Sequence, residues 1–128
     1  MSIQVPVSWG ELIDRITILE LKAQRIPDGP RRAGVRRELA ALQSARATLA
    51  TEPQELAALT AELREVNATL WAVEDALRQH EARADFGADF IELARSVYRT
   101  NDRRASLKSS IDDLLGSEWR DEKLFSGP

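Results

Sequence analysis

Polar side chains interrupt the apolar seams of two long helical patterns in the second half of the chain. The first pattern carries Asn67, Trp71, Glu74 and Arg78, with Asp75 beside them. These four positions follow the spacing i, i+4, i+7 and i+11, which places them in one stripe on a helix. The second pattern carries Tyr98, Arg99, Asn101, Arg104 and Lys108. Charges this close to an apolar seam must be paired, solvated at a cleft or used on a ligand, because an unpaired buried charge is costly.

Two kinds of chemistry fit this polar set. In a ligand site, an anion such as a sugar phosphate or sugar nucleotide would bind to Arg78, Arg99, Arg104 and Lys108. Trp71 or Tyr98 would then stack on a ring, and Glu74 or Asp75 would serve as general base. In a structural network, Arg104 would pair across the hairpin with Glu74 or Asp75, and Glu74 would pair with Arg78 along one helix. The spacing leaves both interpretations open.

Other familiar sites have little support in the sequence. The chain has no cysteine, which excludes disulfides and thiolate zinc sites. His80 is the only histidine, so a metal centre or a serine nucleophile activated by histidine is not expected. The six glycines are isolated and form no phosphate-binding loop. We therefore expect no metal and no cofactor.

Composition predicts one helical domain, residues 1–128, in the cytoplasm. The core must be aliphatic, because aromatic residues make up only 5% of the chain and charged residues 30%. No run of about 18 apolar residues is present, so no membrane span is expected. Residues 1–50 contain eight basic and five acidic residues, and the remainder contains ten and sixteen. This uneven but modest charge argues against a nucleic-acid partner, which requires a strong basic excess.

The first half of the chain predicts two helices after a short extended lead-in, residues 1–8. Ser8 and Glu11 have the spacing of a capping box, so a helix should run from Trp9 to about Arg25. Its charged residues, Asp14, Arg15, Glu20 and Lys22, are expected on a solvated face. A second helix should start at Pro30, after the breaker at 27–30. It begins with a basic cluster that could be solvated or meet an acidic partner or phosphate: Arg31, Arg32, Arg36 and Arg37.

The second half predicts a long helical hairpin. One helix should follow a capping box at 51–54 and carry a seven-residue apolar repeat: Leu56, Leu59, Leu63, Val66, Leu70, Val73 and Leu77. After a break at 85–87, a helix over about 88–115 should end at Gly116. Trp119 and Phe125 are candidate anchors of the tail, residues 117–128. The expected fold is all-α, an antiparallel four-helix hairpin bundle, and its long arm suggests a homodimer or higher homo-oligomer.

Two segments, WGELIDRITILELK and ARSVYRTNDRR, resemble a bacterial family of small uncharacterised helical proteins. The pattern Asn67-x-x-Leu70-Trp71-x-x-Glu74-Asp75-x-x-Arg78, followed by Asn101 and Arg104, resembles a second such family. Both tend to occur near sugar-transferase and surface-polysaccharide genes, which implies a role in lipopolysaccharide or capsule assembly. Ile13, Asp14 and Arg25 are superficially similar to the first helix of the all-helical chorismate mutases, but too few positions match to imply that reaction.

The favoured hypothesis is a non-catalytic accessory or interaction module in surface-glycan assembly, acting as a homo-oligomer with a protein partner. The alternative is a small enzyme or binding protein for an anionic metabolite. The two differ in whether the polar set is paired within the protein or faces an open cavity.

Overall fold

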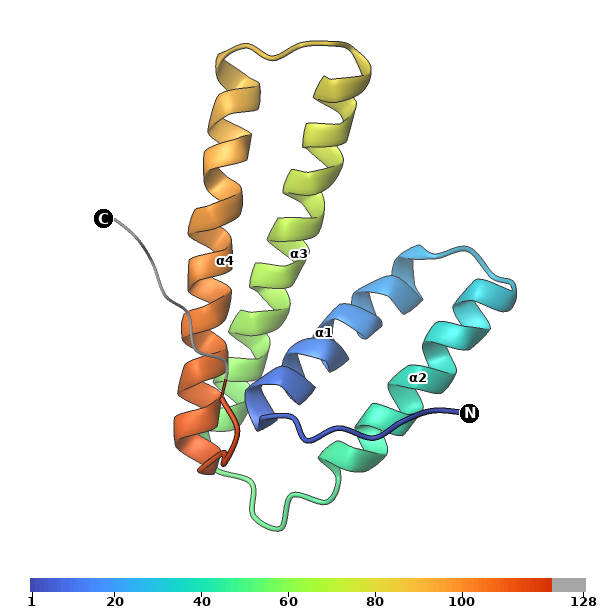
Figure 1. Ribbon diagram of the computed structural model, residues 1–128, viewed down its shortest axis with the longest axis vertical. Helices are drawn as coiled ribbons and strands as arrows, with labels where there is room; N and C mark the ends of the chain where they lie inside the picture. The colour runs from blue at the N-terminus through green and yellow to red at the C-terminus, as the bar shows by residue number, and fades with distance from the viewer. Residues whose placement is uncertain (121–128) are drawn as a thin grey trace.

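The computed structural model describes residues 1–120, and these form four α-helices and no strand. The helices are α1 (Trp9–Arg25), α2 (Pro30–Arg46), α3 (Glu55–Ala82) and α4 (Ala88–Leu115). They are arranged as two helical hairpins, a short one of α1 and α2 and a long arm of α3 and α4 (Figure 1). The predicted all-α class and the four helices are confirmed. None of the described helices is long and apolar enough to cross a membrane.

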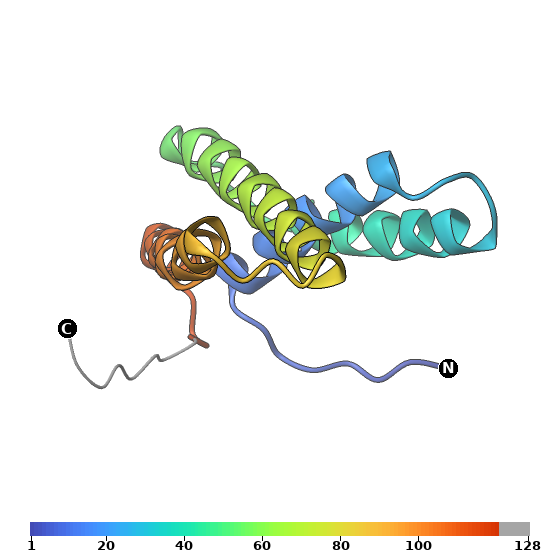
Figure 2. The same ribbon diagram turned by 90° about the horizontal axis from the view of Figure 1, so that it is seen from above.

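Helix α1 is the centre of the fold. It contacts α2, α3 and α4, whereas α2 contacts no other helix than α1. Viewed along the arm, α1 lies between α2 and the α3–α4 pair (Figure 2). The core reflects this arrangement, because Ile13 of α1 is buried among Leu56, Leu63, Leu107 and Ile111 of the arm. The core therefore occupies the lower part of the arm, where α1 crosses it.

The seven-residue repeat of α3 is buried only along part of its length. Leu56, Leu63 and Leu70 are buried, but Leu77, the next residue at the same seven-residue spacing, is partly exposed. The reason is visible in Figure 1: α1 diverges from the arm, and the upper arm consists of α3 and α4 alone. A helix pair buries one seam between its members but has no third layer to cover the flanks of that seam.

The helix ends follow the predicted signals with one exception. Ser8 Oγ accepts a hydrogen bond from the Glu11 amide at 3.0 Å, and Gly116 closes α4 with a left-handed φ of 63°. The capping box expected at 51–54 is wrong. The N-cap residue of helix α3 is Gln54, not Thr51, and no side chain caps the helix; Glu52, within the predicted box, forms an ion pair with Arg46 of α2.

The lead-in and the start of the tail lie on the surface. Residues 1–7 are exposed and form no strand. Trp119 is 55% exposed, so it does not anchor the tail by burial, and Phe125 lies outside the described residues. Ser117 instead ties the tail to the body, since its Oγ accepts from the Trp9 amide at 3.1 Å.

Candidate functional site

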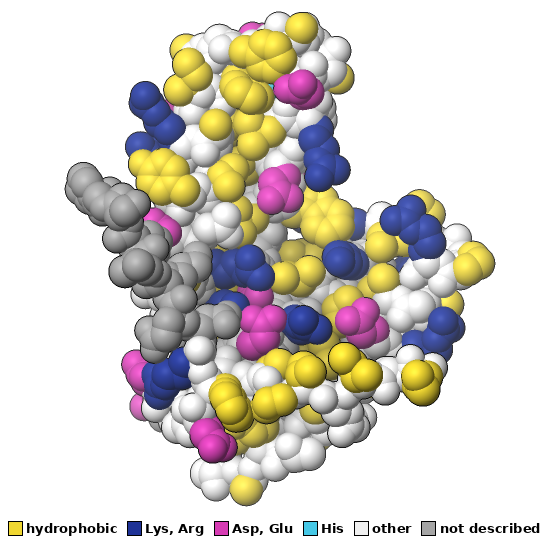
Figure 3. Space-filling view, in the orientation of Figure 1, with side chains coloured by type: hydrophobic (Ala, Val, Ile, Leu, Met, Phe, Trp, Pro, Cys, Tyr) yellow, Lys and Arg dark blue, Asp and Glu magenta, His cyan; other side chains and the backbone are white. Residues whose placement is uncertain are grey.

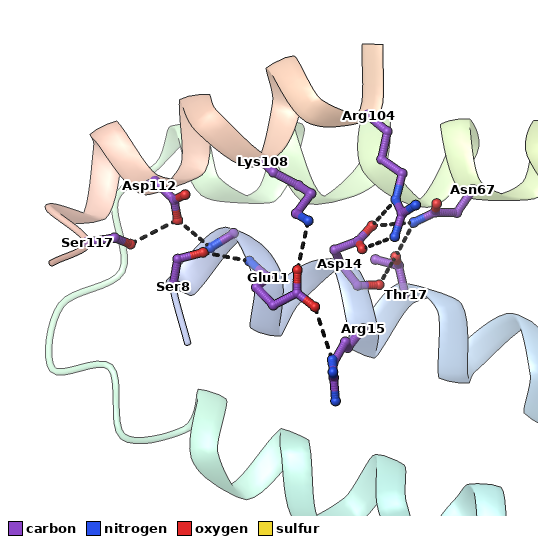
Figure 4. A network of polar contacts seen from close by, with 11 residues as sticks. Ser8, Glu11, Asp14, Arg15, Thr17, Asn67, Arg104, Lys108, Asp112 and Ser117 are labelled. Carbon is purple, nitrogen blue, oxygen red and sulfur yellow. Dashed lines mark hydrogen bonds and ion pairs between the residues drawn. The ribbon is translucent and has the colours of Figure 1, made fainter. Parts of the chain in front are cut away.

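The densest polar network of the described residues lies where α1 crosses the lower arm (Figure 4). The two backbones are unusually close there. A Cβ atom placed on Gly10 of α1 would lie 2.4 Å from the Lys108 carbonyl oxygen of α4. Only glycine permits this approach. The close contact brings the polar side chains of α1 within hydrogen-bond distance of those on α3 and α4.

Asp14 is the centre of the network, and its side chain is almost completely buried. Its Oδ1 accepts from Asn67 Nδ2 of α3 at 2.9 Å and from Arg104 Nε of α4 at 2.9 Å. Arg104 Nη2 donates to the other oxygen, which completes a bidentate ion pair. Thr17 Oγ1 accepts from Asn67 at 2.8 Å and donates to the Asp14 carbonyl at 2.7 Å. One carboxylate thus joins three helices.

Buried charge decides what this network does. Burying a carboxylate is costly unless its oxygens are bonded, and removing one partner of a buried pair costs about 3–5 kcal/mol. Asp14 has partners on both α3 and α4, so α1 has one favourable position on the arm. This arrangement is well suited to fixing the crossing of α1.

Glu11 forms a second, more exposed pair on the same side of α1. Lys108 Nζ lies 2.7 Å from its Oε2, and Arg15 Nε lies 3.1 Å from its Oε1. Burial by itself raises the pKa of Glu11, but the hydrogen bonds and charges of Lys108 and Arg15 outweigh it. The pKa of Glu11 is therefore below its ordinary value.

Asp112 links the end of α4 to the start of α1. Its buried carboxylate accepts from the Gly10 amide at 2.7 Å and from Ser117 Oγ at 2.9 Å. The free amides at the first turn of a helix carry partial positive charge, so a carboxylate at this point is stabilising. Asp112 therefore acts as an N-terminal cap of α1 supplied from another helix.

The structure brings only part of the predicted polar set into this network. Asn67, Arg104 and Lys108 belong to it. Trp71 lies just beyond, with the Arg25 guanidinium 5.1 Å from its ring centroid. The remaining predicted residues lie elsewhere on the arm: Glu74, Asp75, Arg78, Tyr98, Arg99 and Asn101. Tyr98 is 57% exposed, and Arg99 pairs with Glu92 on its own helix at 3.2 Å.

The predicted partners of Arg104 are corrected by the structure. Arg104 pairs with Asp14 of α1, while the side chains of Glu74 and Asp75 are exposed. Glu74 and Arg78 also form no ion pair with each other within residues 1–120. The pairing across the hairpin fails because α1, and not the partner helix of the arm, supplies the nearest carboxylate.

The sequence prediction does not place Asp14, the carboxylate at the centre of the network, in the site. Asp14 is predicted on a solvated face but is 0% exposed. A signal is present in the spacing, because Gly10, Asp14, Thr17 and Leu21 follow the same i, i+4, i+7, i+11 pattern, and all four are buried. A glycine and a threonine flanking an aspartate on a core helix indicate a close approach to another helix rather than a solvated face.

A shallow groove of about 270 Å³ opens beside the network, between α1, α2 and α4. Arg15, Lys22 and Arg104 line it together with Glu11, Asp14 and Glu38. In the space-filling view, charged side chains of both signs gather where the short hairpin meets the arm (Figure 3). Acidic and basic groups are equal in number along the groove, so it offers an anion little net attraction.

The basic cluster of α2 lies away from this network. Arg31, Arg36 and Arg37 are exposed, and Arg32 pairs with Asp28 at 2.5 Å. Helix α2 has no buried residue, so the cluster occupies a solvated helix face. No set of three or more acidic or histidine side chains within residues 1–120 is arranged to hold a metal ion.

Comparison with known proteins adds no assignment to this geometry. No family model matches the chain, and no curated protein or solved structure is significantly similar to it.

Proposed function

We propose that this protein is a non-catalytic helical interaction module that serves bacterial surface-glycan assembly. The observation that supports the first part is the pairing of three of the four candidate anion-binding cations, all but Arg78. Arg104 is bonded to Asp14, Lys108 to Glu11 and Arg99 to Glu92. A ligand anion would have to displace a carboxylate at Arg104 and at Lys108, whereas the Arg99–Glu92 pair is exposed on both sides. The link to surface glycans rests on the family resemblance of the sequence.

Module function also agrees with how the fold distributes its surface. Helix α2 contacts only α1, and in the upper arm α3 and α4 contact only each other. Most side chains of these two regions therefore remain available to partners. The buried network holds the two hairpins at a defined angle, which is what a rigid adaptor requires. We infer that the module works by presenting these surfaces to a protein partner and to a second copy of itself.

The alternative, a small enzyme or binding protein for an anionic metabolite, has weaker support. Arg78, Arg99, Arg104 and Lys108 are the candidate anion ligands, and within residues 1–120 two of them, Arg99 and Arg104, line separate grooves. The groove beside Arg104 carries balanced charge, and its volume of about 270 Å³ is just below the range of small-molecule sites.

A genetic complementation experiment tests the proposal. Deleting the gene should alter the amount or chain length of surface polysaccharide, measured by gel profile and mass spectrometry. The wild-type chain should restore the profile, and so should Asp75→Asn, because no proton transfer is required of that carboxylate. Glu74→Gln is tested in the same complementation assay. An unchanged profile after deletion would contradict the glycan role. Failure of either amide variant despite wild-type folding and oligomeric state would favour the enzyme.

A further inference from the structure

The side of the α3–α4 arm that faces α1 is its inner face. Helix α1 covers this face over only half the length of the arm. Asn67 contacts Asp14 and Thr17, and Trp71 lies against Arg25, the last residue of α1. The same helical stripe continues to Glu74 and Arg78, three and seven residues further along α3. These side chains point in the direction that α1 occupies lower down, but α1 has ended there.

Helix α4 provides the other half of this face. Arg104 points toward α1, and Val97 and Phe90 follow it at spacings of seven residues toward the tip of the arm, with Asn101 one turn above Arg104. Val97, Phe90 and Asn101 are all partly exposed. We call the six residues the upper inner face: Trp71, Glu74, Arg78, Phe90, Val97 and Asn101. Within the part of the chain that the structure describes, no third helix covers it (Figure 1).

Charge on the upper inner face is self-complementary. Glu74 and Arg78 lie one helical turn apart, both are exposed, and neither forms an ion pair with a described residue. In a two-fold symmetric contact, residue i meets residue j of the partner and j meets i. An acid and a base on one stripe satisfy that condition twice, as Glu74 against Arg78 of the second copy and the reverse. A face of like charges would repel its own copy.

We propose that two copies of this chain associate through their upper inner faces, with the arms antiparallel in a four-helix arrangement. The second copy takes the place that α1 has beside the lower arm. It covers the apolar residues of this face that α1 leaves partly exposed, Phe90 and Val97. This inference rests on the proposed self-association and specifies its surface.

Charge exchange between the two positions tests the proposal on the intact chain. Glu74→Arg would place a second arginine opposite Arg78, and Arg78→Glu would place a second glutamate opposite Glu74. Each variant alone should self-associate roughly a hundredfold more weakly, because like charges are brought together twice. An equimolar mixture of the two variants should form a heterodimer, since every contact then joins opposite charges. The double exchange, Glu74→Arg with Arg78→Glu, should dimerise like the wild type.

Light scattering after size exclusion gives the mass of each sample, and native mass spectrometry with a mass tag on one variant identifies the heterodimer. Glu65→Arg is the matched control, because Glu65 is an exposed acid on a different side of α3. It should leave the dimer unchanged, and circular dichroism should show full helicity in every variant.

Three results would overturn the proposal: a monomeric wild type at the highest soluble concentration, single variants that dimerise normally, or a mixture that stays monomeric. The glycan profile of the deletion strain separates these failures from failure of the proposed function. If a monomeric protein still restores the glycan profile, the proposed dimer surface is wrong but the proposed glycan role stands.

Discussion

The lower and upper halves of the arm are built from the same two helices but have different surroundings. In the lower half, α1 supplies carboxylates that bond Asn67, Arg104 and Lys108. In the upper half, Glu74 and Arg78 continue the same stripe without a neighbouring helix. The difference shows that the role of a polar helix stripe is decided by what lies opposite it. The same residue types fix a helix crossing below and form an accessible surface above.

The largest expected effect comes from removing the arginine at the centre of the lower half. Arg104→Ala leaves the buried Asp14 carboxylate with Asn67 but without its ion pair, so the free energy of unfolding should fall by about 3–5 kcal/mol. Urea denaturation measures the change. The control is the adjacent Arg103→Ala, whose pair with Glu62 is exposed on both sides and should contribute at most about 1 kcal/mol. Equal effects of the two variants would contradict the role assigned to Asp14.

The second effect tests how closely α1 approaches α4. Gly10→Ala places a methyl group 2.4 Å from the Lys108 carbonyl oxygen, and that oxygen belongs to rigid helical backbone. Helix α1 must shift, and we expect a loss of about 1–3 kcal/mol in the free energy of unfolding.

Gly34→Ala is the matched control for this substitution. Gly34 also lies within a helix, but the nearest atom to an added methyl group is the flexible end of Arg37 at 3.8 Å. Alanine should raise stability there by about 0.5–1 kcal/mol through helix propensity. The midpoint temperatures of thermal unfolding of the two variants should therefore shift in opposite directions from that of the wild type. A stabilising Gly10→Ala would mean that the two helices are further apart.

The fold was largely predictable from the sequence, but half of the site was not. Apolar periodicity and cap residues identify the four helices, because both are local signals. The pairing of Arg104 depends on which helix crosses the arm and at what height, and neither is encoded locally. Asp14 illustrates this limit. An aspartate on α1 is compatible with both a solvated and a buried position, and only Gly10 and Thr17 on the same stripe indicate a close helix contact.

A smaller effect concerns pH and the Glu11 pair. The folded-state pKa of Glu11 is lowered, so its contribution is present above the ordinary value of 4.5 and is lost as pH falls through the folded-state pKa. Glu11→Gln should lower stability by about 1 kcal/mol at neutral pH, since the pair is partly solvated. The difference between wild type and variant should shrink as pH is lowered below 4.5. Denaturation curves at neutral and acidic pH check this, and a difference that grows on acidification would reverse the assignment.

The smallest effect lies at the boundary between the two halves, where Arg25 covers the Trp71 ring at 5.1 Å. Arg25→Ala removes a partly solvated cation–π contact and should lower the free energy of unfolding by about 0.5 kcal/mol. Arg36→Ala, at an exposed position of α2, is the control and should leave it unchanged. In a chain with Trp9 and Trp119 replaced by phenylalanine, Trp71 fluorescence after Arg25→Ala should indicate greater solvent exposure of the ring, because Arg25 is the last residue of α1 that covers this face. An unaltered spectrum would place the boundary of the covered half lower on the arm, between Asn67 and Trp71.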